Sequence, residues 1–187
     1  MSSSFQVSNI TVDSAVNQTI IDINDGNRSL EARGFLHVHI AAAGNVTITN
    51  TGINNWVQAT DSMFSPHIID GFILNSDNIV VPEDGLYELV FTLTVGISTA
   101  TLQTVQFGLG INGAEPETAL ATSRPFSTTI PDGCAGTSIE LLSAGDVLRI
   151  YGRNLEAGVG NDIILITEGQ LTIHKLGTAP PGTEVIS

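Results

Sequence analysis

Apolar and polar residues alternate with a period of two along residues 86–95, directly after a turn at residues 82–85, with Leu86 and Val90 as apolar exceptions on the polar face. Five large apolar side chains fall on one face of this stretch: Tyr87, Leu89, Phe91, Leu93 and Val95. This period is typical of a β-strand with one buried face, whereas a helix would scatter the five side chains around its circumference. Burial of each side chain contributes roughly 1.5–3 kcal/mol. We therefore expect residues 79–95 to lie at the centre of an apolar core.

Shorter segments rich in β-branched and aromatic residues precede and follow this stretch, separated by turns of Gly, Asn and Asp. Strands are predicted within residues 18–23, 35–40, 46–57, 72–74, 104–111, 126–130, 137–142, 147–151 and 163–176. Tight hairpins are predicted around residues 50–52, 112–113 and 143–146, and a bulge at 168–169. Gly108 and Gly110 fall on the face of their strand opposite the large apolar residues, where another chain can approach closely.

The apolar pattern divides the chain into three parts. Residues 1–44 are rich in Asn, Ser and Asp and have few large apolar side chains before Phe35. They are predicted to form an N-terminal arm whose short strands lean on the main domain, a neighbouring subunit or a larger assembly. Residues 45–177 are predicted to form one β-sandwich or jelly-roll domain. Residues 178–187 contain two prolines and no periodicity, and are predicted to form a flexible tail.

Composition favours an all-β fold and excludes two classes of partner. Charged residues make up only 13% of the 187 residues and hydrophobic residues 42%, with many β-branched side chains among them. The formal net charge is −13, so phosphate backbones and anionic lipids would repel the chain. No segment is apolar for long enough to span a bilayer, and the first residues lack the pattern of a signal peptide. We expect synthesis in a cytoplasm, with neither nucleic acid nor membrane as partner.

Four segments, in the order in which they occur, resemble the trimeric jelly roll of tumour necrosis factor (TNF) and of the complement one-q globular head. They are residues 81–87 (VPEDGLY), similar to the family's P-x-x-G-x-Y motif; residues 108–113 (GLGING), similar to its strand ending in Asn-Gly; residues 141–148 (LLSAGDVL), similar to its L-x-x-G-D-x-(L/V) hairpin; and residues 163–173, in the place of its last strand. That last strand contains ILITEGQLTI and lacks the aromatic-glycine signature usual in the family. The resemblance covers residues 72–176 and implies a jelly-roll β-sandwich that assembles as a homotrimer.

Compact modules of this kind also resemble head fibres, capsid-decorating proteins and tail-fibre tips of bacteriophages. Together with the acidic composition and the dependent arm, this resemblance implies a structural protein of a virion, made in the host cytoplasm. The arm would attach the trimer to capsid or tail proteins. The alternative is a soluble carbohydrate- or receptor-binding module that contacts its ligand, such as a host surface glycan, through loops 112–125 or 152–162.

A candidate trimer interface lies on the strand predicted at residues 147–151. If Leu148 and Ile150 face the core, then Val147, Arg149 and Tyr151 face outward. A valine and a tyrosine on an outer face with few charges are typical of a subunit contact. The alternative is a tyrosine that lies across its own sheet with its hydroxyl in water.

Two groups of residues suggest metal chemistry. His37-Val38-His39 places two imidazoles on one side of a strand, and six such groups around the three-fold axis of a trimer would hold a transition metal, as similar pairs do in some phage fibre and spike tips. The alternative is two polar residues on the solvated face of an edge strand. Residues 22–26 are one residue short of a calcium loop and are interpreted as a turn. The loop acids Asp61, Asp70, Asp77 and Asp84 single out no calcium site, so neither a metal nor another cofactor is predicted.

The sequence shows no set of residues typical of an enzyme. His67 and His174 are isolated along the chain, and no Gly-x-Ser-x-Gly motif places a nucleophile beside a base. Glu115 and Glu117 flank a proline in a loop and are interpreted as solvated charge. Cys134, the single cysteine, excludes an intramolecular disulfide and is expected to be a small half-buried residue. No enzymatic activity is predicted.

Overall fold

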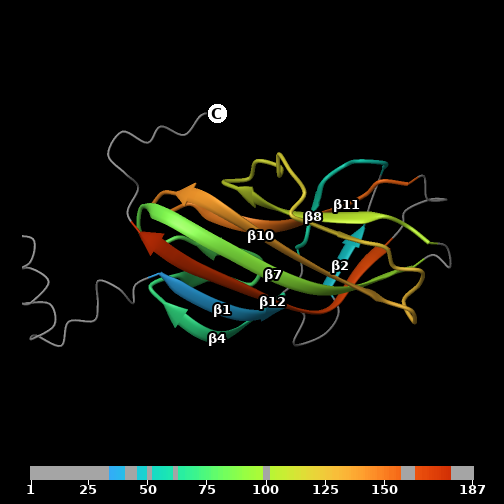
Figure 1. Cartoon of the computed structure of the whole chain (residues 1–187), viewed down its shortest axis with the longest axis horizontal. Coiled ribbons are helices and arrows are strands. Elements are labelled where there is room, and N and C mark those ends of the chain that lie inside the picture. The colour runs from blue at the N-terminus through green and yellow to red at the C-terminus, as the bar shows by residue number, and fades with distance from the viewer. Residues whose placement is uncertain are drawn as a thin grey trace, which may run out of the picture. The chain divides into compact units, whose positions relative to one another are not determined.

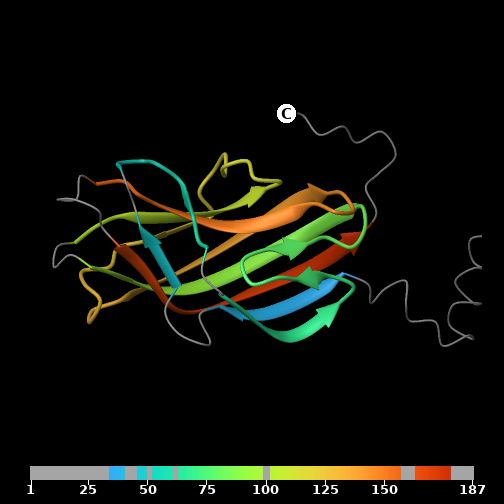
Figure 2. The ribbon, with the colours of Figure 1, turned by 180° about the vertical axis from the view of Figure 1, so that it is seen from behind.

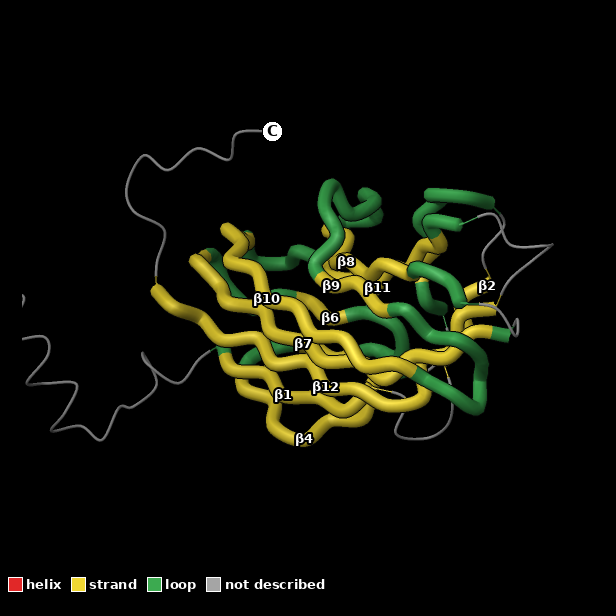
Figure 3. The backbone as a smooth tube through the Cα atoms, turned by 45° about the vertical axis from the view of Figure 1, so that its right-hand side comes forward, coloured by secondary structure: helices red, strands yellow, loops and turns green. Residues whose placement is uncertain are grey.

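The computed structural model describes residues 34–40, 46–49, 52–60, 63–98, 102–156 and 163–177 of the chain. Every regular element in these ranges is a β-strand (Figure 3), and within them no helix is long and apolar enough to cross a membrane. The strand predicted at residues 18–23 and the tail predicted at residues 178–187 lie outside the described residues.

The strands form two antiparallel sheets (Figure 1). Sheet A contains β1 (Phe35–Ile40), β2 (Val46–Thr49), β4 (Phe64–Asp70), β7 (Gly85–Ile97), β10 (Asp132–Leu142) and β12 (Ile163–Gly177). Its order is β10-β7-β12-β1-β4, and β2 also pairs with β12. Sheet B contains β3 (Val57–Gln58), β5 (Ile73–Leu74), β6 (Ile79–Val80), β8 (Val105–Ile111), β9 (Ala121–Ser123) and β11 (Val147–Asn154). Its order is β5-β6-β11-β8-β9, and β3 also pairs with β11.

The inner faces of the two sheets enclose one apolar core. The five side chains predicted to share a face of β7 are all buried, with at most 3% of their surface exposed. Leu36, Val38 and Ile40 of β1 join them from sheet A, and Phe107 and Ile150 join them from sheet B. The alternation read from the sequence is therefore confirmed for the central strand.

Tyr87 shows how the turn before β7 is tied to the core. Its ring is completely buried, and its hydroxyl donates a 2.8 Å hydrogen bond to the carbonyl oxygen of Glu83. Burial, with the nearby charges of Glu83 and Asp84, raises the pKa of Tyr87 to about 12. The Glu83 carboxylate in turn forms a 2.8 Å ion pair with Lys175 of β12. These contacts give the P-x-x-G-x-Y segment a structural role, because they hold the turn against the end of the sandwich.

Two of the predicted hairpins are wrong. The strands on either side of residues 143–146 do not pair: β10 pairs with β7 in sheet A, and β11 pairs with β8, β6 and β3 in sheet B. In the same way β2 belongs to sheet A and β3 to sheet B. Both connections carry the chain from one sheet to the other. A turn sequence shows where the chain reverses, but the partner of each strand depends on which sheet can bury its apolar face.

The segment Phe35–Ile40 is an inner strand of sheet A and not part of a separate arm. It pairs along its whole length with β12 on one side and with β4 on the other. The domain therefore includes β1 and extends before the boundary expected at residue 45. The reason is physical: β1 buries three branched side chains, which gives it a place in the core even though the segment before it is polar.

Four further local predictions have different outcomes. The bulge expected at residues 168–169 lies between Ile166 and Glu168 of β12. The turn at Asn112-Gly113 is confirmed, with positive φ angles of 55° and 84° at these two residues. The described residues 126–130 do not form the strand expected there. They belong to the connection between β9, which ends at Ser123, and β10, which begins at Asp132. The edge strand β4 was not predicted, because its sequence contains a proline and shows no clear alternation.

Candidate functional site

The outer face of sheet A carries a band of side chains without any Asp, Glu, Lys or Arg. Two rows of cross-strand partners run over β10, β7, β12, β1 and β4, which lie side by side in this order (Figure 3). The first row is Ala135, Thr92, Gln170, His39 and Ser65, and the second is Thr137, Val90, Thr172, His37 and Ile68. All of them are exposed or half-buried. We call these residues the acid-free band.

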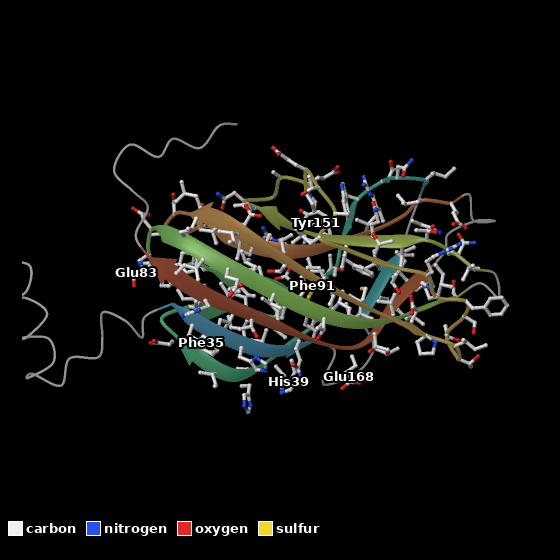
Figure 4. All side chains as sticks on the ribbon, viewed as in Figure 1. Phe35, His39, Glu83, Phe91, Tyr151 and Glu168 are labelled. Carbon is white, nitrogen blue, oxygen red and sulfur yellow. The ribbon has the colours of Figure 1, made fainter. Side chains whose placement is uncertain are left out.

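Acidic side chains of the same face lie beside the acid-free band and not within it. Glu88 of β7 and Asp70 of β4 belong to the next row toward one end of the sheet, together with His174 and Phe35. Glu168 lies beyond the other row, where it pairs with Thr94 (Figure 4). An uncharged centre with charges at its margins is the usual composition of a protein–protein contact.

A shallow hollow of about 550 Å³ opens on this face at one end of the acid-free band. It is lined by Thr92, Leu93, Thr94, Gly133, Cys134, Ala135, Glu168, Gly169 and Gln170. The small side chains at residues 133, 135 and 169 leave this space between longer neighbours. The hollow can therefore receive a side chain from a molecule that docks on the face.

Cys134 lines this hollow and is half-buried, as the sequence predicted. Burial, with a smaller effect of the Asp132 charge, raises the pKa of its thiol to about 11. Only the thiolate reacts readily with disulfide reagents. The residue is therefore kept in its unreactive form at neutral pH.

We expect the Cys134 thiol to react about a hundredfold more slowly in the folded protein than in the urea-unfolded chain at pH 8, because two pKa units lower the thiolate fraction by that factor. Reaction with an aromatic disulfide reagent, followed by absorbance, measures both rates. The rate for the folded protein should continue to rise tenfold per pH unit above pH 9, where the unfolded chain levels off. Equal rates in the two states would contradict the burial of the thiol.

The outer face of β8 in sheet B is covered by the chain's own loop. A Cβ atom added to Gly108 would lie 2.6 Å from the Cβ of Pro116, and one added to Gly110 would collide with the carbonyl oxygen of Ala114 and the ring of Tyr151. Backbone does approach closely at these two glycines, but the approaching segment is the loop that follows β8 in the same chain and not another chain. Glycine is required at both positions because any side chain would lift this loop from the sheet.

The candidate interface residues Val147, Arg149 and Tyr151 lie on β11, in this partly covered sheet. Val147 and Arg149 are half-buried, but Tyr151 is only 6% exposed, with its ring packed over Gly110. Tyr151 thus has little free surface to offer to another subunit. A contact through these three residues stays a prediction.

Three of the four histidines come together on the outer face of sheet A. The ring centroids of His37, His39 and His67 are 5.4–5.7 Å apart, and the rings meet edge to face. The Nδ1 atom of His37 is hydrogen-bonded to Thr172 Oγ1 at 2.9 Å. Partial burial and the two neighbouring imidazoles lower the pKa of His37. His174 stands apart from this group, with its ring 6.0 Å from that of Phe35.

The sequence identified His37 and His39 as a pair but treated His67 as isolated. These residues are brought together by β4, a strand that was not predicted from the sequence. Its pairing with β1 skips one residue, because Ile68 is opposite His37 and Pro66 is opposite Val38. His67 is the extra residue at this bulge. A proline next to a histidine was the one sequence signal of an edge strand with a bulge, and it is too weak to identify a partner.

The other described residues that the sequence suggested as functional do not join the histidine cluster. Trp56 is 9% exposed and lies under the guanidinium of Arg153, 4.3 Å from the ring centroid to Cζ, so its ring face is covered. The Asp84 carboxylate accepts a hydrogen bond from the backbone N–H of Ala144 at 2.8 Å and so joins two turns. Glu115 and Glu117 are exposed in the loop after β8. Asp61 and residues 22–26 lie outside the described residues.

Searches against known proteins return structural matches alone. No family model matches the chain, and no curated protein matches its sequence. The structure of Eiger TNF from S. frugiperda is similar with a TM-score of 0.51 and 18% identity, over 82% of this chain and 100% of that one. Murine APRIL (TM-score 0.43, 16% identity, 76% of this chain and 99% of that one) and the globular domain of zebrafish complement 1qA (TM-score 0.39, 16% identity, 77% and 99%) also match. With two antiparallel sheets in this order around one core, the described chain has the TNF-like jelly-roll fold that its sequence motifs predicted.

Proposed function

We propose that this chain is a non-enzymatic structural protein of a bacteriophage virion, which assembles as a homotrimer through the outer face of sheet A and attaches to capsid or tail proteins through its N-terminal residues. The observation that carries the proposal is the acid-free band. A band of a strongly acidic protein that crosses five strands without an acidic side chain is suited to contact other copies of the same chain.

Electrostatics explains why such a band favours self-association. Each chain has 19 acidic residues against 6 basic ones, so two copies repel each other over most orientations. The repulsion is weakest where the facing surfaces lack carboxylates. Across the band, Val90 is 39% exposed and Ile68 is 48% exposed, so apolar area is available for burial. The hollow beside the band offers a place for a side chain of the neighbouring copy.

The sequence motifs support the number of copies, and the acidic composition and the N-terminal segment support the setting. The resemblance to trimeric jelly rolls supports three copies, related by a contact that closes after three subunits. The polar segment before β1 supports a role in attachment, through added strands or through ordering on a partner surface. A trimer made in the host cytoplasm and carried on the particle needs neither a cofactor nor a bound nucleic acid.

Two measurements on the full-length protein test this proposal. Light scattering coupled to size-exclusion chromatography should give three times the chain mass of 19.6 kDa. Purified protein added to phage particles that lack it should bind them, and a chain without residues 1–32 should remain trimeric but fail to bind. A monomer at high concentration would overturn the assembly, and full binding by the shortened chain would overturn the attachment. Saturable binding to a glycan array without binding to particles would favour the carbohydrate-binding alternative.

A further inference from the structure

A cluster of three imidazoles on one sheet face is unusual in a chain that has only four histidines. His37 and His39 point outward from β1, since the residues between and beside them, Leu36, Val38 and Ile40, are buried. Figure 4 shows the side chain of His39 on the outer side of β1. The third ring, that of His67, comes from the neighbouring strand β4, which lies beside β1 at the edge of the sheet (Figure 2).

The bulge in β4 is what brings the third ring to this face. In a regular antiparallel pair, alternate residues of β4 would point outward, and residue 67 would share the inward direction of residue 69. The skipped residue shifts the alternation, so that Ser65 is opposite His39 and Ile68 is opposite His37, with His67 between them. The His67 ring is nearly equidistant from the other two, at 5.4 Å from His37 and 5.6 Å from His39.

These distances are close to those of a three-histidine metal site. Imidazoles bound to one tetrahedral ion through nitrogen–metal bonds of about 2.0–2.1 Å have ring centroids about 5 Å apart. The centroids here are 5.4–5.7 Å apart and the rings meet edge to face, so each ring must move slightly inward and also turn one nitrogen toward a common point. In the present rotamers, no three His, Cys, Asp or Glu side chains of the described residues already have the donor geometry of a bound ion. His67 is exposed, however, so a change of rotamer there is not blocked by surrounding packing and can turn its ring toward the other two.

The hydrogen bond of His37 supports the same assignment. Metal-binding histidines usually engage one ring nitrogen with an oxygen of the protein, which orients the ring and leaves the other nitrogen for the metal. His37 Nδ1 is held by Thr172 Oγ1 at 2.9 Å, so Nε2 is the donor that remains. Thr172 lies in the acid-free band on β12. Because β1 lies between β12 and β4, Thr172 holds the His37 ring from one side while His67 approaches it from the other.

We propose that His37, His39 and His67 of a single chain bind one divalent first-row transition ion of the zinc class, with the fourth coordination position open to water or to an anionic group. Imidazole nitrogen is a preferred ligand of zinc, copper, nickel and cobalt, and it does not suit calcium or magnesium. The proposal differs from a site shared around a three-fold axis, because all three ligands come from one chain. It does not depend on the trimer or on the virion role.

The test uses full-length protein without a histidine tag, treated with chelator and then dialysed. Calorimetric titration with Zn²⁺ should show one ion per chain with micromolar or tighter affinity, and Co²⁺ should give visible absorption bands of a tetrahedral site. His67→Gln, His37→Gln and His39→Gln should each weaken binding at least tenfold. His174→Gln is the matched control, because it removes the fourth histidine of the same sheet face and should leave binding unchanged.

Circular dichroism of each variant checks that the sheet is intact, which glutamine at these outward positions should permit. Four results would overturn the proposal: no binding below millimolar Zn²⁺, one ion per three chains, equal affinity of His67→Gln and the unaltered protein, or an equal loss with His174→Gln. Equal affinity of His67→Gln and the unaltered protein would reduce the site to the His37–His39 pair. One ion per three chains would mean that the site is shared between subunits.

Discussion

A chain that lacks residues 1–44 is expected not to fold, whereas a chain that lacks residues 1–32 is expected to unfold cooperatively. The longer deletion removes β1 from between β12 and β4 in sheet A. With it go the buried side chains of Leu36, Val38 and Ile40, each of which contributes roughly 1.5–3 kcal/mol by burial. Their sum of about 5–9 kcal/mol is comparable with the total stability of a typical domain, about 5–15 kcal/mol.

The shorter deletion keeps every described strand, since β1 begins at Phe35. Thermal unfolding followed by far-ultraviolet circular dichroism distinguishes the two chains. The chain beginning at residue 33 should show a single transition, and the chain beginning at residue 45 should show none. A cooperative transition in the latter would mean that β1 is dispensable, and that the boundary at residue 45 was the correct one after all.

Replacement of Val90 by Arg is expected to convert the proposed trimer to monomer without unfolding the chain. Val90 lies in the acid-free band, between Thr137 of β10 and Thr172 of β12, and is 39% exposed in the single chain. An arginine there is solvated in the monomer but loses its water when a second copy covers the face. An unpaired charge buried in a contact costs about 3 kcal/mol or more, roughly a hundredfold in the association constant.

Val147→Arg is the matched control, because it introduces the same change on β11 of sheet B, at one of the interface residues predicted from the sequence. Light scattering of both variants over a range of concentrations gives the answer. A monomeric Val90→Arg and a trimeric Val147→Arg would assign the contact to sheet A. The opposite result would assign it to Val147, Arg149 and Tyr151, and would remove the acid-free band from the proposed function.

Strands whose apolar residues alternate cleanly were predictable from the chain. The five inward residues of β7 are an example, and so are the long β12 and the Asn112-Gly113 turn. In each case the signal is local: side-chain direction repeats every two residues, and a positive φ angle favours Asn or Gly. The motifs that resemble the TNF family are made of these same local signals, which is why they identified the fold at 18% identity to a solved structure.

The pairing of strands could not be read in the same way. Residues 143–146 have the sequence of a tight turn, and a turn is found there, yet β10 and β11 enter different sheets. A turn determines the reversal of the chain only. Whether the two strands then bond to each other depends on the burial of both apolar faces, to which residues as distant as Leu89 and Phe107 contribute.

The amino-acid sequence by itself determined that this protein is all-β, acidic and built on a jelly roll, because residue type and spacing act over a few neighbours. Only the tertiary structure decided that β1 lies inside the sheet, that an uncharged band crosses one outer face, and that His67 joins His37 and His39. These features depend on cross-strand register between segments far apart in the chain. Register is set by the burial of whole faces, and a single bulged residue in β4 is enough to change which side chains meet.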